Sequence, residues 1–533
     1  MTTRKLDAML CETGPTLQPC SVKKEGTDMR HYLIAHDLGT SGDKATLFDT
    51  DGNLIRSITS AYRTHFFNAN WAEQNPQDWW KAFCESTKAL LDGFDIKEVA
   101  AISFSGQMMG CVPVDKNGDA LRPAIIWADQ RATKQAGQLL TAFTPFEFYH
   151  ITGHRVSASY SIEKLMWLRD NEPEIFSKVY RILQPKDYLV QKLTGRFATD
   201  YSDASGTNAL DLQTLSWSQK IITASGLDLS LFPELVPSTE VVGEVTPGIS
   251  KECGLAVGTP VVMGAGDGVC AATGAASVSS GDAYHYLGSS SWIAYTADKP
   301  LYDPEMRTFN WVHMVAGKFC PTGTMQAAGN SFNYIREMLC DGEKIRAESE
   351  GRSVYDVVND MLRSSPIGSR GLIYLPYLLG ERSPRWNPLA RGTYIGLTME
   401  HSRGDLVHSA LEGVLMNLSI ILECFRREQS IDSLRLIGGL AQSDEICKML
   451  ADIFGVRAVL MDKLEEATST GAAVCGGVGV GVLPDFSAVT RFIHPDRSFE
   501  YDPVRHADYE PVKALFEDCY AAMIPLYERL STL

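Results

Sequence analysis

The stretch that decides the fold is residues 32–49, YLIAHDLGTSGDKATLFD. An apolar run ends in a turn rich in glycine and hydroxyl residues, and a second apolar run follows it. This pattern predicts two strands joined by a tight turn. Asp51-Gly52 predicts another turn, leading into a third strand at 53–59. Glycines in the first turn let the backbone approach a ligand, and Thr40 and Ser41 add hydroxyl donors.

One carboxylate, Asp37, stands where the first apolar run ends. It cannot bind a phosphate directly, because both groups are negatively charged. It can hold a Mg²⁺ ion that in turn binds phosphates. Taken alone, the stretch is equally consistent with a β-hairpin that carries an exposed Asp, and residues further along the chain decide between the two readings.

Length and composition set the class of protein. At 533 residues the chain predicts two large domains plus tails. A net charge of −16 argues against a general nucleic-acid or membrane-surface binder, and no apolar stretch is long enough to cross a bilayer. The twelve cysteines show neither a CxxC pair nor zinc-ligand spacing, so we expect free thiols and a cytoplasmic location. Residues 1–30 lack the apolar core of a signal peptide and predict an N-terminal extension.

The first half of the chain shows strands that end in polar residues. Strands are predicted at 99–104 and 124–127, with a helix at 77–91 and a hairpin across 116–119. Residues 132–255 look mainly helical with loops. Polar residues at strand ends are typical of an α/β sheet with a site along its carboxyl edge.

The opening pattern partly returns in the second half. Residues 260–268, PVVMGAGDG, are a strand, a glycine-rich turn and an Asp, and strands at 282–287 and 434–437 also end in glycine turns. A helix is predicted at 444–454. This recurrence predicts two related α/β domains that face one cleft. The predicted segments are an N-terminal extension at 1–30, domains at 31–278 and 279–490, and a mostly helical tail at 491–533.

Three glycine-rich turns, at 37–42, 288–291 and 438–443, could together cradle a nucleotide, two of them for phosphates and the third for the adenosine end. Each one alone would more often serve close packing than phosphate binding. Asp267, held between glycines, is the candidate general base that accepts a proton from a hydroxyl as its oxygen attacks a γ-phosphorus. The alternative is an Asp that caps its own turn. Asp37 with Mg²⁺ would neutralise charge on the transferred group.

A sugar would meet donors at the ends of other strands. Gln107, Met108 and Met109 follow the strand at 99–104, although they could form a loop with buried methionines. Trp127 is either a core residue or a stacking platform, and Asp129 with Arg131 is expected to be a solvated pair. Glu381 and Arg382 belong to an unusual polar cluster that forms either a cleft wall or a salt-bridged loop.

Two long motifs carry a family resemblance. The first is Ser159-x-Ser161-x-x-Lys164-Leu165-x-Trp167-Leu168-x-Asp170-Asn171. The second is Gly392-x-Tyr394-x-Gly396-Leu397, then seven residues, then Asp405-Leu406-x-x-Ser409-Ala410-Leu411-Glu412. The chain resembles the FGGY carbohydrate kinases from about residue 32 to residue 482, and among them it is most similar to xylulokinases.

The resemblance implies an α/β fold of two actin-like (ribonuclease H-like) domains flanking a ligand cleft, and ATP-dependent phosphorylation of a sugar hydroxyl with Mg²⁺. It implies Asp267 as catalytic base and Asp37 and Asp267 as metal ligands. The residues implied for the nucleotide are Gly39, Thr40, Ser41, Gly288, Ser289, Ser290, Gly329, Gly438, Gly439 and Ser443. Those implied for the sugar are Gln107, Met108, Met109, Trp127, Asp267, Gly268, Glu381 and Arg382.

Two positions depart from the family pattern. Many xylulokinases carry His where this chain has Met109, and many family members carry Asn or Gln where it has Gly268. Both changes remove a side-chain hydrogen bond near the sugar, and such a loss alters discrimination between substrates. The leading hypothesis is a kinase that converts D-xylulose to D-xylulose 5-phosphate, in a possible homodimer. The alternatives are a kinase for another ketose, polyol or signalling sugar, a non-catalytic actin-like sensor, and an actin-like filament or chaperone ATPase.

Overall fold

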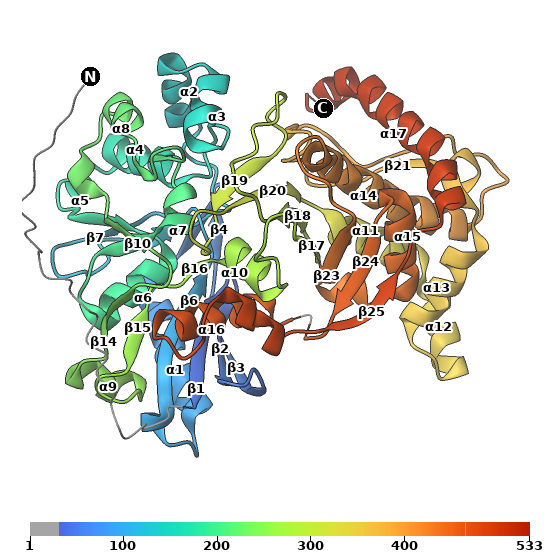
Figure 1. Cartoon of the computed structure of the whole chain (residues 1–533). Helices are drawn as coiled ribbons and strands as arrows, with labels where there is room; N and C mark the ends of the chain where they lie inside the picture. The colour runs from blue at the N-terminus through green and yellow to red at the C-terminus, as the bar shows by residue number, and fades with distance from the viewer. Residues whose placement is uncertain (1–30, 464, 533) are drawn as a thin grey trace, which may run out of the picture.

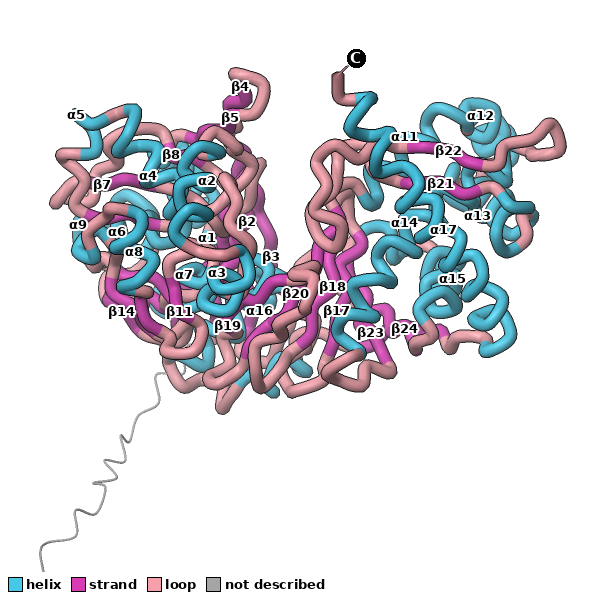
Figure 2. The backbone as a smooth tube through the Cα atoms, turned by 90° about the horizontal axis from the view of Figure 1, so that it is seen from above, coloured by secondary structure: helices cyan, strands magenta, loops and turns pink. Residues whose placement is uncertain are grey.

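The computed structural model describes residues 31–463 and 465–532, so the predicted extension at 1–30 lies outside the described residues. The described chain forms two α/β lobes, each built on one mixed sheet (Figure 1). Figure 2 shows these lobes side by side from above, with α16, β19 and β20 near the place where they meet. We call the lobe that holds β1 the first lobe and the other the second lobe.

The first sheet is built outward from β1 (Tyr32–Leu38). β1 pairs antiparallel with β2 (Gly42–Asp49), and β2 pairs antiparallel with β3 (Leu54–Ala61), so both predicted turns are confirmed. On its other side β1 is parallel to β6 (Val99–Gly106), which is buried along its whole length, as expected for a central parallel strand. The sheet continues through β15 (Pro260–Val262) and β14 (Val241–Glu244), and β16 (Ala265–Gly266) pairs with the end of β6.

The second sheet repeats this order. β17 (Ala283–Leu287) pairs antiparallel with β18 (Ser291–Tyr295) and parallel with β23 (Ser433–Ile437), just as β1 pairs with β2 and β6. The remaining strands are β19 (Phe309–Val312), β20 (Phe319–Met325), β24 (Arg457–Met461) and β25 (Pro495–Phe499). The order β20-β18-β17-β23-β24-β25 matches β3-β2-β1-β6-β15-β14, with the same parallel and antiparallel pairs. The prediction of two related α/β domains is therefore confirmed.

Helices cover both sheets. α1 begins at Pro76 after an Asn75 N-cap and buries Trp79 and Phe83 against the first sheet, as the predicted helix at 77–91 requires. The other helices of the first lobe are α2 (Thr133–Ala142), α3 (Pro145–Thr152), α4 (Ser161–Asn171), α5 (Pro173–Phe176), α6 (Pro185–Thr194), α7 (Tyr201–Ser205), α8 (Gln219–Ser225), α9 (Pro247–Cys253) and α10 (Asp267–Gly274). Later in the chain come α11 (Ala328–Leu339), α12 (Asp341–Glu350), α13 (Val354–Ser364), α14 (Arg403–Arg426), α15 (Asp444–Phe454), α16 (Ala467–Gly479) and α17 (Pro503–Leu530).

One helix of the second half of the chain packs on the first sheet. α16 lies against β1 and β6 and makes its most extensive contact with α10. Glycines permit this closeness, because a Cβ on Gly274 would lie 1.8 Å from the carbonyl oxygen of Ala467, and a Cβ on Gly471 would lie 2.0 Å from that of Cys270. This contact along α10, from Cys270 to Gly274, joins the second half of the chain to the first sheet.

The predicted hairpin across 116–119 is present as a short turn, in which Val114 forms an antiparallel bridge with Ala120 and the Leu121 N–H donates to the Pro113 carbonyl at 3.0 Å. The Asp115 carboxylate accepts hydrogen bonds from the backbone N–H groups of Asn117 and Asp119, at 2.8 and 3.0 Å, which stabilises this turn. Over its length, β7 (Val112–Val114) pairs with the distant β9 (Arg181–Leu183), which the local sequence does not indicate.

Among the described helices, α14 alone has the length and apolar content to cross a membrane, but 94% of its apolar 18-residue stretch is buried inside the protein. It is the central helix of the second lobe, and it starts in a capping box between Ser402 and Asp405. The ten cysteines that the structure describes are all free.

Candidate active site

Asp37 lies near the end of β1 and is held by hydroxyl groups from two other elements. Ser105 on the parallel neighbour β6 donates to one carboxylate oxygen at 2.7 Å, and Thr468 on α16 donates to the other at 2.6 Å. Each oxygen keeps a further lone pair for a ligand. The closely packed α16 therefore reaches the predicted metal-binding carboxylate directly.

Asp267 is the first residue of α10, and Gly266 precedes it at the end of β16. The sequence predicts a tight turn between glycines here, and the structure shows a helix start in which the Gly268 N–H donates to the Asp267 carboxylate at 2.7 Å. Burial, and secondarily the negative charge of Asp37, raise the pKa of Asp267 to about 7. A carboxyl with such a pKa can exchange a proton at neutral pH.

The two acids flank the same strand end. Ser105 of β6 pairs with Asp37 on one side and with Ala265 on the other, while Gly106 pairs with Leu38 and Gly266. Their backbones are thus two strand spacings apart, about 10 Å. This is the edge of the sheet at which the sequence predicts a site.

A cavity of about 470 Å³ opens between the lobes beside Asp267. The first lobe contributes Thr40, Met108, Met109, Trp127, Asp267 and Gly268. The second lobe contributes Ser289, Ser290, Trp292, Phe309, Trp311, Thr322, Thr324, Met325, Gln326, Asn330, Leu379 and Arg382. Asp37 does not line this cavity, but Thr40 of the same turn does.

The sugar-side residues divide into those that line the cavity and those that lie behind it. Met108, Met109, Trp127, Asp267, Gly268 and Arg382 line it. Gln107 lies behind it with 2% of its surface exposed, and its amide donates to the Gly39 carbonyl at 3.2 Å and to the Gln74 side chain at 2.8 Å. In this arrangement Gln107 supports the first glycine turn, and its predicted contact with the sugar stays a prediction.

Glu381 is also placed behind the wall. Its carboxylate accepts from the backbone N–H groups of Gln326 and Arg382, at 2.8 and 2.9 Å, and from the Asn417 amide at 3.1 Å. Burial raises the pKa of Glu381 to about 8. The carboxyl therefore fixes the segments that carry two cavity residues, and its own predicted sugar contact stays a prediction.

The buried cation Lys164 organises the opposite wall. Its ammonium donates to the carbonyl oxygens of Met109 and Ile126, both at 2.8 Å, and to that of Ser159 at 2.5 Å. Met109 has a positive φ of 61°, so this bond holds a strained residue. Burial lowers the pKa of Lys164 to about 7. The sequence places Lys164 in a family motif, but its contacts with Met109 and Ile126 join segments more than 35 residues distant and could not be foreseen.

Trp127 is fixed by the first glycine turn, because its indole N–H donates to the Thr40 hydroxyl at 3.0 Å. Behind it, the expected solvated pair of Asp129 and Arg131 is wrong. The two side chains form a buried ion pair at 2.7 Å, and the Arg131 guanidinium stacks on Trp71 and Trp167. Buried charges need such pairing, and the surrounding aromatic rings exclude water from it.

The predicted nucleotide turns of the second lobe meet one another. A Cβ on Gly329 would lie 2.3 Å from the Gly288 carbonyl oxygen, and one on Gly438 would lie 2.7 Å from that of Leu287. The Asn330 N–H donates to the Ser289 carbonyl at 2.9 Å. Ser443 caps α15 and donates to Asn359 on α13 at 2.8 Å. Gly288, Gly329, Gly438 and their neighbours therefore form one glycine-lined junction in the second lobe, next to Ser289 and Ser290 of the cavity.

Family models cover most of the chain. Residues 32–274 match the N-terminal domain of the FGGY family of carbohydrate kinases, and residues 283–480 match its C-terminal domain. The chain belongs to the FGGY family of carbohydrate kinases. It is therefore a phosphotransferase that acts on a sugar, and the family relationship implies ATP as the donor.

Relatives of this FGGY kinase include gluconokinases and xylulose kinases. A gluconokinase of Bacillus subtilis is 30% identical over 95% of this chain and 96% of its own length, and a xylulose kinase of Lactococcus lactis is 32% identical over 92% and 96%. Crystal structures of a xylulose kinase and of a gluconate kinase from Lactobacillus acidophilus each superpose with a TM-score of 0.87, at 27% identity, over 94% of this chain and 99% of theirs. The predicted actin-like (ribonuclease H-like) fold is thereby confirmed.

The carboxylates of this FGGY kinase suit a Mg²⁺ ion that takes one or two protein ligands and completes its coordination with other groups. The described residues contain no group of three or more His, Cys, Asp or Glu side chains arranged to hold a metal. Mg²⁺ at phosphoryl-transfer sites is commonly held by one or two carboxylates together with water and the phosphates themselves. Asp37, whose two oxygens are oriented by Ser105 and Thr468, fits that mode of binding.

Several cavity residues were not predicted from the sequence. Trp292, Phe309, Trp311, Thr322 and Thr324 come from the antiparallel strands β18, β19 and β20, of which only β18 follows a predicted glycine turn. They reach the cavity only because these strands pair across the second sheet. Aromatic residues at alternate strand positions are the only local signal, and that signal is equally typical of core strands.

Proposed function

We propose that this FGGY kinase transfers the γ-phosphoryl group of ATP, with Mg²⁺, to the terminal hydroxyl of a pentulose, and that the pentulose is D-xylulose. The observation that carries the proposal is Asp267 on the cavity wall at the start of α10, with its pKa raised to about 7. Relatives named xylulose kinase support the choice of sugar. A cytoplasmic location fits the same role.

In the proposed reaction Asp267 accepts the proton of the sugar hydroxyl while that oxygen attacks the γ-phosphorus. Asp37 would hold Mg²⁺, and Asp267 would be a second ligand to it. When bound, Mg²⁺ supplies positive charge to the phosphate oxygens. The backbone of the Gly39–Ser41 turn and of the Gly288–Ser290 turn positions the phosphates, and the Gly438–Ser443 turn with Gly329 holds the adenosine end.

Most of the cavity wall is apolar, and only a few polar side chains on it can bind the hydroxyl groups of a sugar. Trp127, Trp292 and Trp311 can stack on the C–H faces of a carbohydrate, while Thr322, Thr324 and Gln326 can exchange hydrogen bonds with hydroxyls. Met109 and Gly268 offer no polar side-chain atoms suited to this. A small neutral ketose needs fewer such bonds than a longer polyol, which favours a pentulose.

The test is a substrate panel. Sugar-dependent release of ADP is measured with ATP, Mg²⁺ and D-xylulose, D-ribulose, L-ribulose, glycerol or D-gluconate. We expect kcat/KM for D-xylulose to exceed the others by about tenfold or more. Absence of sugar-dependent ADP release with the whole panel would remove the proposal, and ATP hydrolysis accompanied by assembly would favour a filament-forming ATPase.

A second candidate substrate is a sugar acid such as D-gluconate. Arg382 is the one cation among the residues that line the cavity, and a guanidinium pairs well with a carboxylate. The gluconokinase relatives agree with this possibility. Arg382 also interacts with the buried Tyr160 hydroxyl, which gives it a structural role if the substrate is neutral.

Arg382→Gln separates the two candidates. For a sugar acid, kcat/KM should fall about 100-fold or more relative to wild type, since a charge-assisted hydrogen bond is lost. For D-xylulose the fall should be much smaller. A similar loss with both substrates would assign Arg382 a structural role only.

A further inference from the structure

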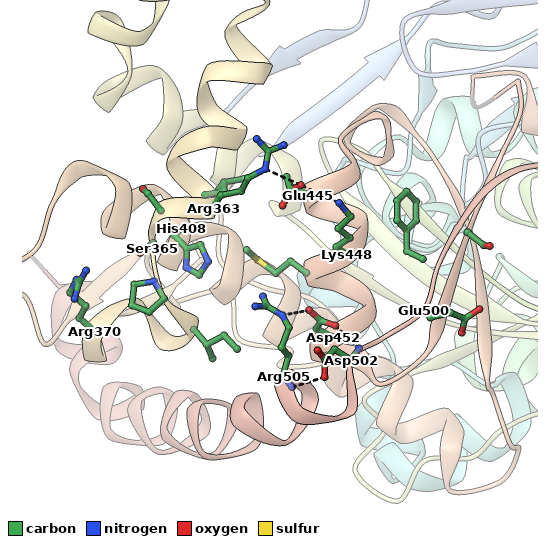
Figure 3. Close-up of a pocket in the computed structure, with 17 residues that line it drawn as sticks. Arg363, Ser365, Arg370, His408, Glu445, Lys448, Asp452, Glu500, Asp502 and Arg505 are labelled. Carbon is green, nitrogen blue, oxygen red and sulfur yellow. Dashed lines mark hydrogen bonds and ion pairs between the residues drawn. The ribbon is translucent and has the colours of Figure 1, made fainter.

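A second cavity, of about 880 Å³, lies in the second lobe, and its charged side chains pair with each other (Figure 3). Arg363 pairs with Glu445 at 3.1 Å, and Arg505 pairs with Asp452 at 2.6 Å. The cavity of about 470 Å³ between the lobes differs, because it keeps a hydrogen-bond donor without a partner in the described chain. That donor is the indole N–H of Trp311.

The tryptophans on the wall between the lobes differ in what their indole N–H groups meet. Trp127 donates to the Thr40 hydroxyl at 3.0 Å, and Trp292 donates to the Tyr284 hydroxyl at 2.8 Å. For Trp311, no described residue accepts a hydrogen bond from the indole N–H. Only 5% of the Trp311 surface is exposed, yet its nitrogen remains accessible, so the free N–H faces the cavity.

A donor in so confined a place needs an acceptor, because an N–H that loses water without gaining another partner is costly. In the free enzyme, water that enters the cavity can accept from this N–H. A ligand that displaces this water has to offer an oxygen at the same place. The Trp311 N–H therefore selects for a ligand that carries an acceptor beside it.

The packing around Trp311 fixes the direction of this N–H. The side chain projects from β19, where Trp311 pairs with Cys320 of β20. The rings of His154 and Phe309 lie against the indole, with centroid distances of 4.7 and 5.2 Å. A Cβ on Gly206 would lie 3.3 Å from Cζ3 of the indole, so this glycine leaves the room that the ring needs. A donor held in this way is preorganised for one ligand position.

The free N–H lies beside the candidate base. Trp311 Nε1 is 3.8 Å from the position that a Cβ on Gly268 would take, and no other described atom from outside α10 comes within 4 Å of that position. Gly268 directly follows Asp267, and it is the position at which many family members carry Asn or Gln. The indole N–H of Trp311 thus borders the space of the side chain that this kinase lacks.

We propose that the Trp311 N–H donates a hydrogen bond to a sugar oxygen next to the reacting hydroxyl, which makes Trp311 a specificity-determining residue. It replaces the amide that Asn or Gln would supply in place of Gly268. The inference rests on the proposed kinase reaction, in which Asp267 takes the proton of that hydroxyl. Because an indole N–H only donates, the oxygen that it meets is an acceptor, such as a ketose carbonyl or a hydroxyl oxygen. A substrate without this oxygen leaves the N–H unpaired and is rejected.

Nuclear magnetic resonance of the ¹⁵N-labelled full chain observes the proposed bond directly. The indole N–H signal of Trp311 is the one that Trp311→Phe removes. We expect this signal to move downfield on addition of D-xylulose or D-gluconate, because a hydrogen bond deshields the proton. The signals of Trp80 and Trp217, whose N–H groups donate to Glu252 and to the Pro233 carbonyl, should stay in place. A Trp311 signal that neither sugar moves downfield overturns the inference, whether or not the sugars are phosphorylated.

Kinetics with a rescue variant separate a lost hydrogen bond from a disturbed fold. Trp311→Phe should lower kcat/KM for the better sugar substrate about 10- to 100-fold and leave KM for ATP unchanged. Adding Gly268→Asn to that variant should recover at least about threefold, because its amide returns a donor to the same space. Gly268→Ala in the same background is the matched control and should recover nothing.

Unchanged kcat/KM in Trp311→Phe, or equal effects of Asn and Ala in place of Gly268, would overturn the inference. Failure of the proposed reaction has a different signature. If the wild-type protein releases no ADP with any sugar, the kinase reaction at Asp267 is removed, and the shift of the Trp311 signal still decides whether its N–H binds the sugar.

Discussion

At the scale of single residues, the proposed chemistry depends on the carboxyl of Asp267. Replacing it by Asn keeps the shape but removes the base, so we expect kcat to fall by about 10²- to 10⁴-fold. Binding of ATP, measured by calorimetry, should remain. Unchanged turnover would mean that another group takes the proton.

The pH dependence follows from the same carboxyl. Only the ionised form of Asp267 can accept a proton, and its pKa is about 7, so kcat/KM should rise with pH and level off above that value. Folding has the opposite dependence: the pKa is raised in the native state, so ionisation of Asp267 costs stability as the pH rises from about 4 toward 7. Asp267→Asn should therefore unfold at the same or a higher temperature than wild type at pH 7. A lower unfolding temperature would attribute its inactivity to misfolding.

Thr468 is a positioning residue for Asp37. Thr468→Val removes one of the two hydroxyl donors to that carboxylate, with little change in shape. We expect the Mg²⁺ concentration for half-maximal rate to rise about tenfold, and Mn²⁺ binding, measured by electron paramagnetic resonance, to weaken equally.

Thr470→Val is the control for Thr468→Val. Thr470 is two residues further along α16 and is fully buried, and among the described residues its hydroxyl has no partner. Valine there should leave Mn²⁺ affinity unchanged. A similar weakening in both variants would show that α16 is disturbed as a whole and that Thr468 has no particular role.

At the scale of elements, the contact between α10 and α16 places both acids. Gly471→Val should destabilise the protein by about 3 kcal/mol or more and lower its unfolding midpoint, because the new Cβ would meet the Cys270 carbonyl at 2.0 Å. Chemical denaturation measures this loss. Gly137→Ala, inside α2 with no atom within 4 Å of the added Cβ, should instead stabilise by about 1 kcal/mol. Equal effects of the two changes would remove the packing argument.

Elements with a local signal could be predicted from the sequence. α15 was predicted at 444–454, which is where it lies, because a serine cap, an amphipathic pattern and a following glycine are all within that stretch. The pairing of β7 with β9 joins residues almost 70 positions apart, and nothing near Lys116–Asp119 indicates it. The packing of α16 on the first sheet could not be predicted for the same reason, because it joins residues far apart in the sequence.

At the scale of the whole molecule, the cavity exists because two lobes face each other. The glycine turns could be predicted because the backbone itself carries their chemistry, and Asp267 because a carboxylate between two glycines at a strand end is a local signal. The wall from β18 to β20 could not, since its tryptophans and threonines gain a role only when the second lobe stands opposite the first. For the same reason the sequence did not show that Gln107 and Glu381 lie behind the wall.

The arrangement of the lobes leads to the last prediction, closure on the ligands. The cavity is bordered by both lobes, and Leu379 on its wall is still 63% exposed, so water can enter. Excluding water would protect ATP from hydrolysis. Ligands that contact residues of both lobes favour a closer approach of the two lobes. We expect small-angle X-ray scattering to show a smaller radius of gyration with ADP and D-xylulose together than with either alone. An unchanged radius, with both ligands shown by calorimetry to be bound, would mean that this kinase works in the open arrangement.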